Sequence, residues 1–253
     1  MTGPGPTAME EAVRICETAA EAGITVRLAG GLAIQYLTPE FPPRGGDSQD
    51  LDLATMSSDR RSLTQFLAGS GYVADKTFNA LYGHKQLYFR SAETGRSLDV
   101  LVDRLHMCHT VEFAGRLQRM PLTLDLADLL LSKLQIVELN EKDAQDILYL
   151  CSAYPVSDGD EPGTIGLDRI RPIVANDWGW WRTATVNVDR ITALASGDGH
   201  GLVPAGGQHD AVQQLGMLRS AMETAPKSLR WKARARVGER VRWYELPEET
   251  PHH

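Results

Sequence analysis

The sequence has few of the features that mark membrane proteins, secreted proteins or proteins that bind nucleic acid over their whole surface. No apolar run in its 253 residues approaches the roughly 20 residues that span a bilayer, so we expect no membrane span. The first seven residues have neither the basic nor the apolar region of a secretory signal, and we expect residues 1–7 to form a disordered tail. A net charge of −7 argues against a surface that is basic throughout, although it is compatible with a local basic patch.

Cysteine is also scarce. Cys16, Cys108 and Cys151 are odd in number and far apart, which argues against a disulfide framework and favours reduced thiols in the cytoplasm.

Hydrophobic residues make up 42% of the chain and charged residues 23%, which is enough apolar content for a buried core in one large or two small domains. Because the pattern turns helical after Pro121, we predict one domain over 8–120 and a second over 121–253.

The spacing of apolar residues and the positions of glycine and other turn-forming residues predict the helices and strands of the first domain. Helical spacing is found over 8–22, where Gly23 ends the helix, and again over 59–68. Alternating or β-rich segments predict strands over 24–29, 72–74, 85–90 and 97–103. The last two strands are joined by a short glycine-containing turn, so we expect them to pair with each other.

Two neighbouring aspartates stand out in this domain. Asp50 and Asp52 are two residues apart on a short alternating segment, and such side chains point to the same side of a strand. Leu51 and Leu53 would then face the core and hold the carboxylates rigidly. Two close carboxylates repel each other, and a raised pKa or a bound divalent cation relieves the repulsion. The alternative is a strand end with two solvated aspartates.

Two other stretches favour a site for metal and phosphate. The strand over 24–29 runs into Gly30 and Gly31, after which residues 32–37 read as a helix. Glycines allow a ligand to approach the backbone closely, and the N–H groups of a helix start favour an anion. On the strand over 97–103, Asp99 lies on the face opposite the apolar residues and supplies a third carboxylate.

The loop before Asp50 contributes two further candidates. Arg44 and Ser48 are close enough in sequence to contact phosphate oxygens. For Arg44, a solvated loop arginine is the alternative.

In the second domain, helical spacing predicts a helix over 125–138 in which Lys133 falls on the apolar stripe. A lysine there must extend to solvent or meet an anion. A helix over 141–153 carries Asp143 and Asp146 on one face, with Lys142 as a local partner. Further predictions are a linker over 155–166, helices over 167–181, 183–195 and 209–225, and a glycine-rich loop over 196–208.

The ordered set of Gly30-Gly31, Asp50-Leu51-Asp52 and Asp99 resembles the nucleotidyltransferase superfamily, the polymerase-beta-like fold that includes the AbiEii/MenT-like proteins. In that family a Gly-Gly or Gly-Ser pair opens a helix, Asp-x-Asp follows on a strand, and another Asp lies on a later strand. In weaker form the resemblance extends to Lys133 and Asp146 as nucleotide-binding residues. The second glycine is a departure, because many relatives carry a serine hydroxyl there.

The resemblance implies an α/β nucleotidyltransferase-fold mixed sheet with flanking helices and a mainly helical C-terminal domain. It also implies two Mg²⁺ ions held by Asp50, Asp52 and Asp99, with NTP as substrate and an acceptor hydroxyl activated by Asp99. The acceptor is left open among RNA or tRNA, a protein and a small molecule. A toxin-like member would have an antitoxin partner. The alternative function is a catalytically silent nucleotide- or RNA-binding module.

A basic segment over 227–244 is the candidate contact for an RNA acceptor. It interleaves aromatic residues with Lys227, Arg230, Lys232, Arg234, Arg236, Arg240 and Arg242. Its spacing fits a helix or a hairpin, and the alternative role for its arginines is pairing with the protein's own acids.

The spacing of His106 and His109 suggests zinc. No cysteine or carboxylate cluster completes four ligands, so we expect loop and surface histidines.

Overall fold

The computed structural model describes residues 5–43, 50–197 and 202–246. By its internal contacts the chain divides into two compact units. Unit 1 consists of Met1–Pro39, Pro43–Leu105 and Glu112–Asp125, and unit 2 of Glu40–Pro42, His106–Val111 and Leu126–His253. The division passes through a hairpin formed by β6 (Arg104–His106) and β7 (Thr110–Glu112).

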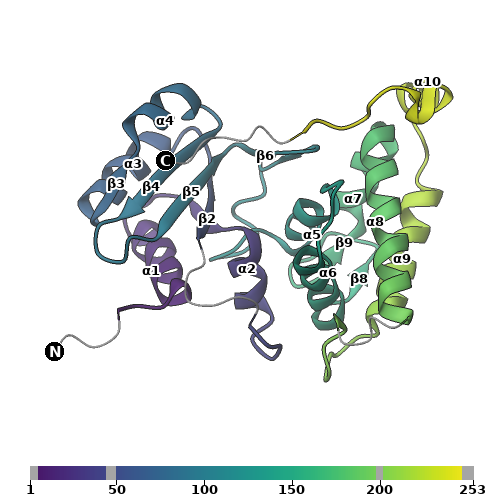
Figure 1. Ribbon diagram of the computed structural model, residues 1–253, viewed down its shortest axis with the longest axis horizontal. Helices are drawn as coiled ribbons and strands as arrows, with labels where there is room; N and C mark the ends of the chain where they lie inside the picture. Colours follow the sequence, from purple (N-terminus) through teal and green to yellow (C-terminus); the bar gives the residue numbers. More distant parts are fainter. Residues whose placement is uncertain (1–4, 44–49, 198–201, 247–253) are drawn as a thin grey trace. The chain divides into compact units, whose positions relative to one another are not determined.

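Unit 1 is built on a five-stranded mixed sheet with the strand order β1-β2-β5-β4-β3 (Figure 1). The strands are β1 (Val26–Leu28), β2 (Leu51–Thr55), β3 (Tyr72–Ala74), β4 (Gln86–Ser91) and β5 (Ser97–Val102). The β2–β5 pair is parallel, and the β1–β2, β4–β5 and β3–β4 pairs are antiparallel. The predicted mixed sheet and the predicted pairing of β4 with β5 are therefore confirmed, although β1 is shorter than the strand predicted over 24–29.

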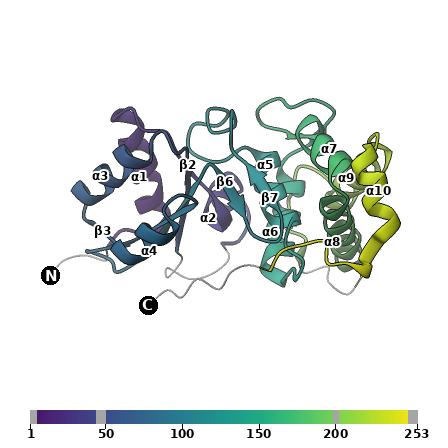
Figure 2. The same cartoon turned by 90° about the horizontal axis from the view of Figure 1, so that it is seen from above.

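The alternation in the sequence decides which face of the sheet is buried. Leu51 and Leu53 of β2 are fully buried, as are Leu98 and Val100 of β5, because successive side chains of a strand point to opposite faces. Figure 2 shows the helices on the two faces: α1 (Ala8–Glu21) and α3 (Arg60–Gly69) lie side by side on one, and α4 (Lys76–Tyr82) on the other. Both α1 and α3 were predicted, whereas α4 was not.

The outer edge of β1 is covered by the chain that leaves the sheet. Leu28 receives a hydrogen bond from the N–H of Leu124 and donates one to the carbonyl of Leu122, at 2.8 and 2.7 Å. These bonds satisfy the backbone of an edge strand. They explain why unit 1 continues as far as Asp125.

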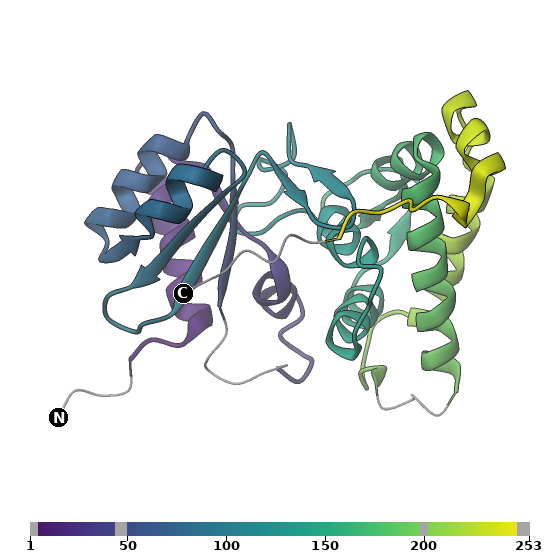
Figure 3. The same cartoon turned by 45° about the horizontal axis from the view of Figure 1, so that its top comes forward.

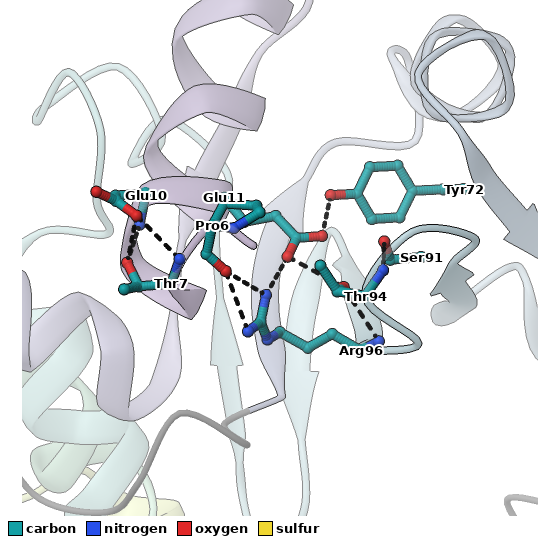
Figure 4. Close-up of polar contacts among 8 residues, drawn as sticks. All are labelled: Pro6, Thr7, Glu10, Glu11, Tyr72, Ser91, Thr94 and Arg96. Carbon is teal, nitrogen blue, oxygen red and sulfur yellow. Dashed lines mark hydrogen bonds and ion pairs between the residues drawn. The ribbon is translucent and has the colours of Figure 1, made fainter. Parts of the chain in front are cut away.

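A buried ionic cluster connects α1 to β3 and to the turn between β4 and β5 (Figure 4). Glu11, only 1% exposed, forms an ion pair with Arg96 and accepts hydrogen bonds from the hydroxyls of Tyr72 (2.5 Å) and Thr94 (3.3 Å). Burial, together with the hydrogen bond to Glu11, raises the pKa of the Tyr72 phenol. A buried charge is tolerated when it is paired and hydrogen-bonded, so this cluster fixes α1 against the sheet.

Unit 2 is mainly helical, as predicted. Its helices are α5 (Leu126–Leu134), α6 (Glu141–Ala153), α7 (Leu167–Asn176), α8 (Trp178–Ser196), α9 (Ala211–Thr224) and α10 (Leu229–Val237), followed by the 3-10 helix η2 (Gly238–Arg240). The long helices α8 and α9 run side by side (Figure 1). The side chain of Asn140 caps α6 by accepting a hydrogen bond from the N–H of Asp143 at 2.9 Å, and α6 begins at the residue predicted.

Three predictions for unit 2 were wrong in detail. The helix predicted over 125–138 ends at Leu134. The predicted linker over 155–166 contains two short parallel strands, β8 (Val156–Ser157) and β9 (Ile165–Gly166). The helices predicted over 167–181 and 183–195 instead break at Asp177, because its carboxylate accepts hydrogen bonds from the N–H groups of Gly179 and Trp180 and caps α8.

The ambiguity in the basic segment is resolved in favour of a helix. Ser228 caps α10 by accepting a hydrogen bond from the N–H of Trp231, and the helix ends at Gly238, which has a φ of 59°. Glycine adopts this left-handed conformation without the steric cost of a side chain. In the described part of the chain, no helix is long and apolar enough to cross a membrane.

Candidate active site

The sheet register places two of the predicted carboxylates side by side. Asp52 on β2 and Asp99 on β5 are register partners on neighbouring parallel strands. Their side chains project from the same face of the sheet, and both residues are half-buried. The resemblance implied that Asp52 and Asp99 lie close enough to share a metal, but it did not give the strand pairing or the register that bring them together.

Gly30 brings the start of α2 (Gly30–Leu37) directly against this pair. It has a φ of 61°, and a Cβ at this position would overlap the Oδ2 atom of Asp52. The N–H of Ala29 also donates to the backbone carbonyl of Asp52 at 2.8 Å. A glycine is therefore required both by the backbone conformation and by the close approach of the carboxylate. No side chain of a described residue caps the N-terminus of α2, and the N–H groups of a helix start favour an anionic ligand.

Asp99 is oriented by a residue that the sequence analysis did not identify. The side-chain amide of Gln86, on β4, donates a hydrogen bond to Oδ1 of Asp99 at 2.6 Å. Tyr88, two residues further along β4, is the register partner of Asp99. Gln86 therefore acts as a positioning residue. Alternation along β4 puts Gln86 on the same face as Tyr88, and this much could be predicted from the sequence. That this face is also the face of Asp99 follows only from the register between β4 and β5.

The remaining predicted residues of the first domain are less well defined. Asp50 is exposed and lies one residue before β2, so it is outside the strand on which it was predicted. Arg44 and Ser48 lie outside the described residues. Within the described residues, no group of three or more histidine, cysteine, aspartate or glutamate side chains is placed to hold a metal ion.

Lys133 and Asp146, which the resemblance links to the nucleotide, both belong to unit 2. The ammonium of Lys133 lies 2.7 Å from Oδ1 of Asp143 and 3.0 Å from Oδ2 of Asp146, joining α5 to α6. All three side chains are largely buried. Of the two alternatives, extension to solvent and contact with an anion, the structure shows contact with anions, and these are two carboxylates of the protein. Lys142, the predicted local partner of the two aspartates, is not part of this cluster. A role in nucleotide binding stays a prediction.

The cations of the basic segment fall into two groups: those that bond to backbone carbonyls, and those that form no ion pair with a described acid. The guanidinium of Arg234 donates to the carbonyls of Gly238 and Val241, both at 2.6 Å, and the ammonium of Lys227 donates to the carbonyl of Met222. In the described part of the chain, five others have no ion pair with an acid: Arg230, Lys232, Arg236, Arg240 and Arg242. Among the described residues, neutralisation by the protein's own acids is therefore not the role of these five.

The two histidines do not form a zinc site with other described residues. His106 pairs with Glu245 at 2.9 Å. His109 is 8% exposed, so the expectation of a surface histidine was wrong for this residue. Its Nε2 lies 2.8 Å from Oγ1 of Thr183, and burial lowers its pKa to about 4. His109 is therefore neutral at pH 7.

No family model and no curated protein matches the chain. Among solved structures, the chain is similar to an antigenic nucleotidyltransferase-like protein from Paracoccidioides brasiliensis, with 15% identity over 88% of this chain and 94% of that one and a TM-score of 0.41. It is also similar to the STING-associated CdnE c-di-GMP synthase from Capnocytophaga granulosa, with 15% identity over 89% and 84% of the two chains and a TM-score of 0.27. TM-scores this low assign neither an activity nor a ligand.

Proposed function

We propose that unit 1 is a metal-dependent nucleotidyltransferase domain, which moves a nucleoside monophosphate from an NTP to a hydroxyl acceptor. The observation that carries the proposal is the register pairing of Asp52 with Asp99 beside Gly30 at the start of α2. Carboxylates for a metal and backbone N–H groups for a phosphate thus lie together at one end of β2. The resemblance of the same residues to the nucleotidyltransferase pattern supports this interpretation.

The donor set of the pair fits Mg²⁺. This ion is commonly bound through one or two carboxylates, with waters and substrate phosphates completing its octahedral shell. Asp52 and Asp99 would hold it, and Asp50 would complete the set that the resemblance implies. When bound, Mg²⁺ would neutralise the developing charge on the phosphates. Asp99 would accept the proton of the acceptor hydroxyl, and Gln86 would hold its carboxylate in place.

For the acceptor, we propose an RNA held by the basic segment. Phosphate contacts require cations that are not already paired, and Arg230, Lys232, Arg236 and Arg240 meet this condition among the described residues. Lys227 and Arg234 already bond to backbone carbonyls, so they would contribute less. A toxin-like role with an antitoxin partner rests on the resemblance alone.

The test is transfer from each labelled NTP, with Mg²⁺, to separate RNA, protein and small-molecule fractions of a cell extract. We expect label on RNA together with pyrophosphate release. In Asp52→Asn and in Asp99→Asn the rate should fall by about 100-fold or more, since metal stabilisation of transition-state charge amounts to several kcal/mol. Glu93→Gln is the matched control, because it removes one exposed carboxylate from the turn between β4 and β5 and should leave the rate unchanged.

Transfer by Asp52→Asn at the wild-type rate would sink the proposed site. Tight NTP binding without pyrophosphate release, across all acceptor fractions, would favour the catalytically silent module instead. Label on a small molecule alone would retain the transferase and reject the RNA acceptor.

A further inference from the structure

Unit 2 contains a pocket of about 760 Å³ that the proposed transfer chemistry does not use. It lies at the start of α8, and all of its lining residues belong to unit 2. Its lining combines aromatic rings with guanidinium groups: Trp178, Trp243, Tyr244, Arg230, Arg234 and Arg242. The volume is within the range of small-ligand sites, roughly 300–1,000 Å³.

The pocket is formed because the chain after α10 folds back over α8. Figure 3 shows this segment as the yellow trace that leaves α10 and returns past the green helices. The N–H of Glu245 donates to the carbonyl of Cys108 at 3.1 Å, and the indole N–H of Trp243 donates to Oγ1 of Thr183 at 3.1 Å. A Cβ on Gly179 would lie 2.5 Å from the carbonyl oxygen of Trp243. The aromatic wall is thus fixed by hydrogen bonds and by close packing.

Each of the two acids of the pocket has a hydrogen-bond partner within the protein, whereas two of the arginines of the pocket form no ion pair with a described acid. Asp177 caps α8, and Glu245 pairs with His106. Arg230 and Arg242 are exposed and form no ion pair with any described acid. Arg242 lies 5.8 Å from the ring centroid of Tyr244.

Arg234 shows how a guanidinium and an aromatic ring are arranged in this pocket. Its carbon Cζ lies 4.9 Å from the ring centroid of Trp178, while its nitrogens bond to backbone carbonyls. The other two guanidiniums keep donors for a ligand. Because Asp177 occupies the first N–H groups of α8, the helix start is not the anion site, and the attraction for an anion comes from Arg230 and Arg242.

We propose that this pocket binds one nucleoside monophosphate unit, with its base against the aromatic wall and its phosphate at Arg230 and Arg242. A nucleotide provides both features the pocket selects, a planar π-surface and a phosphate. The source is a free nucleotide or a nucleotide within a single RNA strand. The inference goes beyond transfer in unit 1, and it gives the proposed RNA acceptor a defined contact.

The tryptophans of the chain provide a selective probe. All five, Trp178, Trp180, Trp181, Trp231 and Trp243, lie in unit 2. Tryptophan emission, corrected for ligand absorption, is followed as AMP, adenosine, inorganic phosphate or a short oligoadenylate is added to the full chain. We expect saturable quenching by AMP, with adenosine and phosphate weaker by about tenfold or more because each lacks one of the two groups.

Matched variants then test the lining residues. Arg230→Ala combined with Arg242→Ala should weaken AMP binding by roughly tenfold or more. Arg236→Ala combined with Arg240→Ala removes the same charge from the same segment without touching the pocket lining, and should leave AMP binding unchanged. Asp52→Asn should also leave the quenching unchanged, which separates this site from the proposed transfer site in unit 1.

Three results would overturn the inference: phosphate binding as tightly as AMP, AMP binding that is indifferent to Arg230 and Arg242, or quenching that disappears in Asp52→Asn. Tighter binding of the oligoadenylate than of AMP would support the site and identify an RNA strand as its source. Equal binding of the two would support the site and identify the free nucleotide.

Discussion

The two candidate sites differ in charge and in how they are built. In unit 1, acidic side chains project from neighbouring strands of one sheet, and a helix start approaches them through a single glycine. In unit 2, cations and aromatic rings come from α8, α10 and the chain that folds back after η2. The comparison teaches that a sheet register can hold like charges close together, whereas a pocket lined by cations and aromatic rings needs groups from several segments of the chain.

If this comparison is right, a change in one unit should leave the site of the other unit intact. Tryptophan emission reports unit 2 alone, because unit 1 contains no tryptophan. Far-ultraviolet circular dichroism reports both units. The predictions below use these two probes.

The largest effect is expected from the buried cluster of unit 1. Arg96→Met leaves Glu11 buried without its cation, and we expect a loss of about 3–5 kcal/mol in the free energy of unfolding. The melting transition seen by circular dichroism should shift, while the tryptophan transition stays in place. Arg171→Met breaks an exposed pair with Asp158 and should cost less than about 1 kcal/mol. Equal shifts of both transitions in Arg96→Met would show that the units unfold together. This result would contradict the expectation that a change in one unit leaves the other unit intact.

Lys133 tests whether unit 2 contributes to the nucleotide site. Lys133→Met leaves two largely buried carboxylates without their ammonium, so unit 2 should lose about 3 kcal/mol of stability, visible in the tryptophan transition. A role in NTP binding predicts in addition a weaker NTP affinity, measured below the melting temperature. Lys142→Met removes a neighbouring lysine that is exposed and serves as the control. Unchanged NTP affinity in Lys133→Met would limit the lysine to a structural role.

The stability of unit 2 should also depend on pH through His109. Burial lowers its pKa to about 4 from 6.5, so the unfolded chain binds the proton before the folded chain does. The stabilising contribution is present above pH 6.5 and is lost as the pH falls toward 4, up to roughly 3 kcal/mol. Chemical unfolding followed by tryptophan emission should show a smaller acid loss in His109→Gln than in the wild type. An equal loss would assign the acid sensitivity to the carboxylates.

A smaller effect is expected from the glycine beside Asp52. Gly30→Ala and Gly95→Ala both place an alanine at positive φ, but only at Gly30 does the new Cβ overlap a carboxylate. Each should cost about 1 kcal/mol for the backbone, and Gly30→Ala should cost roughly 1–2 kcal/mol more and lower transfer activity. Both unfolding curves and transfer rates are measured. Equal effects on stability and activity would show that the close approach to Asp52 has no role.

The smallest effect concerns RNA binding by the exposed cations outside the pocket. Each phosphate contact that is lost removes roughly 0.7 from the slope of the logarithm of affinity against the logarithm of salt for single strands. Arg236→Ala combined with Arg240→Ala should therefore flatten the slope by about 1.4 while leaving NTP affinity unchanged. Arg14→Ala combined with Arg61→Ala removes two charges from unit 1 and should not change the slope. No difference between the two pairs would reject the basic segment as the RNA contact.

Several features of the site were predictable because they depend on only a few neighbouring residues. The strand, the glycine pair and the helix of residues 26–37 follow from alternation and glycine position, and Leu51 and Leu53 are buried as their spacing predicts. The bounds of helix α6 were predicted, whereas its N-terminal cap at Asn140 was not. Asp50 was wrongly placed within the strand because the ends of elements depend on hydrogen bonds that spacing does not reveal.

The sequence by itself determined the five strands of the sheet in unit 1, the buried faces of β2 and β5, and the presence of candidate acids on these two strands. Only the tertiary structure decided that Asp52 and Asp99 are register partners, that Gln86 bonds to Asp99, that Lys133 meets Asp143 and Asp146, and that Trp243 returns to α8. The physical reason is the distance along the sequence between the residues that interact. Strand alternation and helix caps act over two to four residues, whereas register, ion pairing between helices and chain reversal depend on packing between residues that are far apart in the sequence.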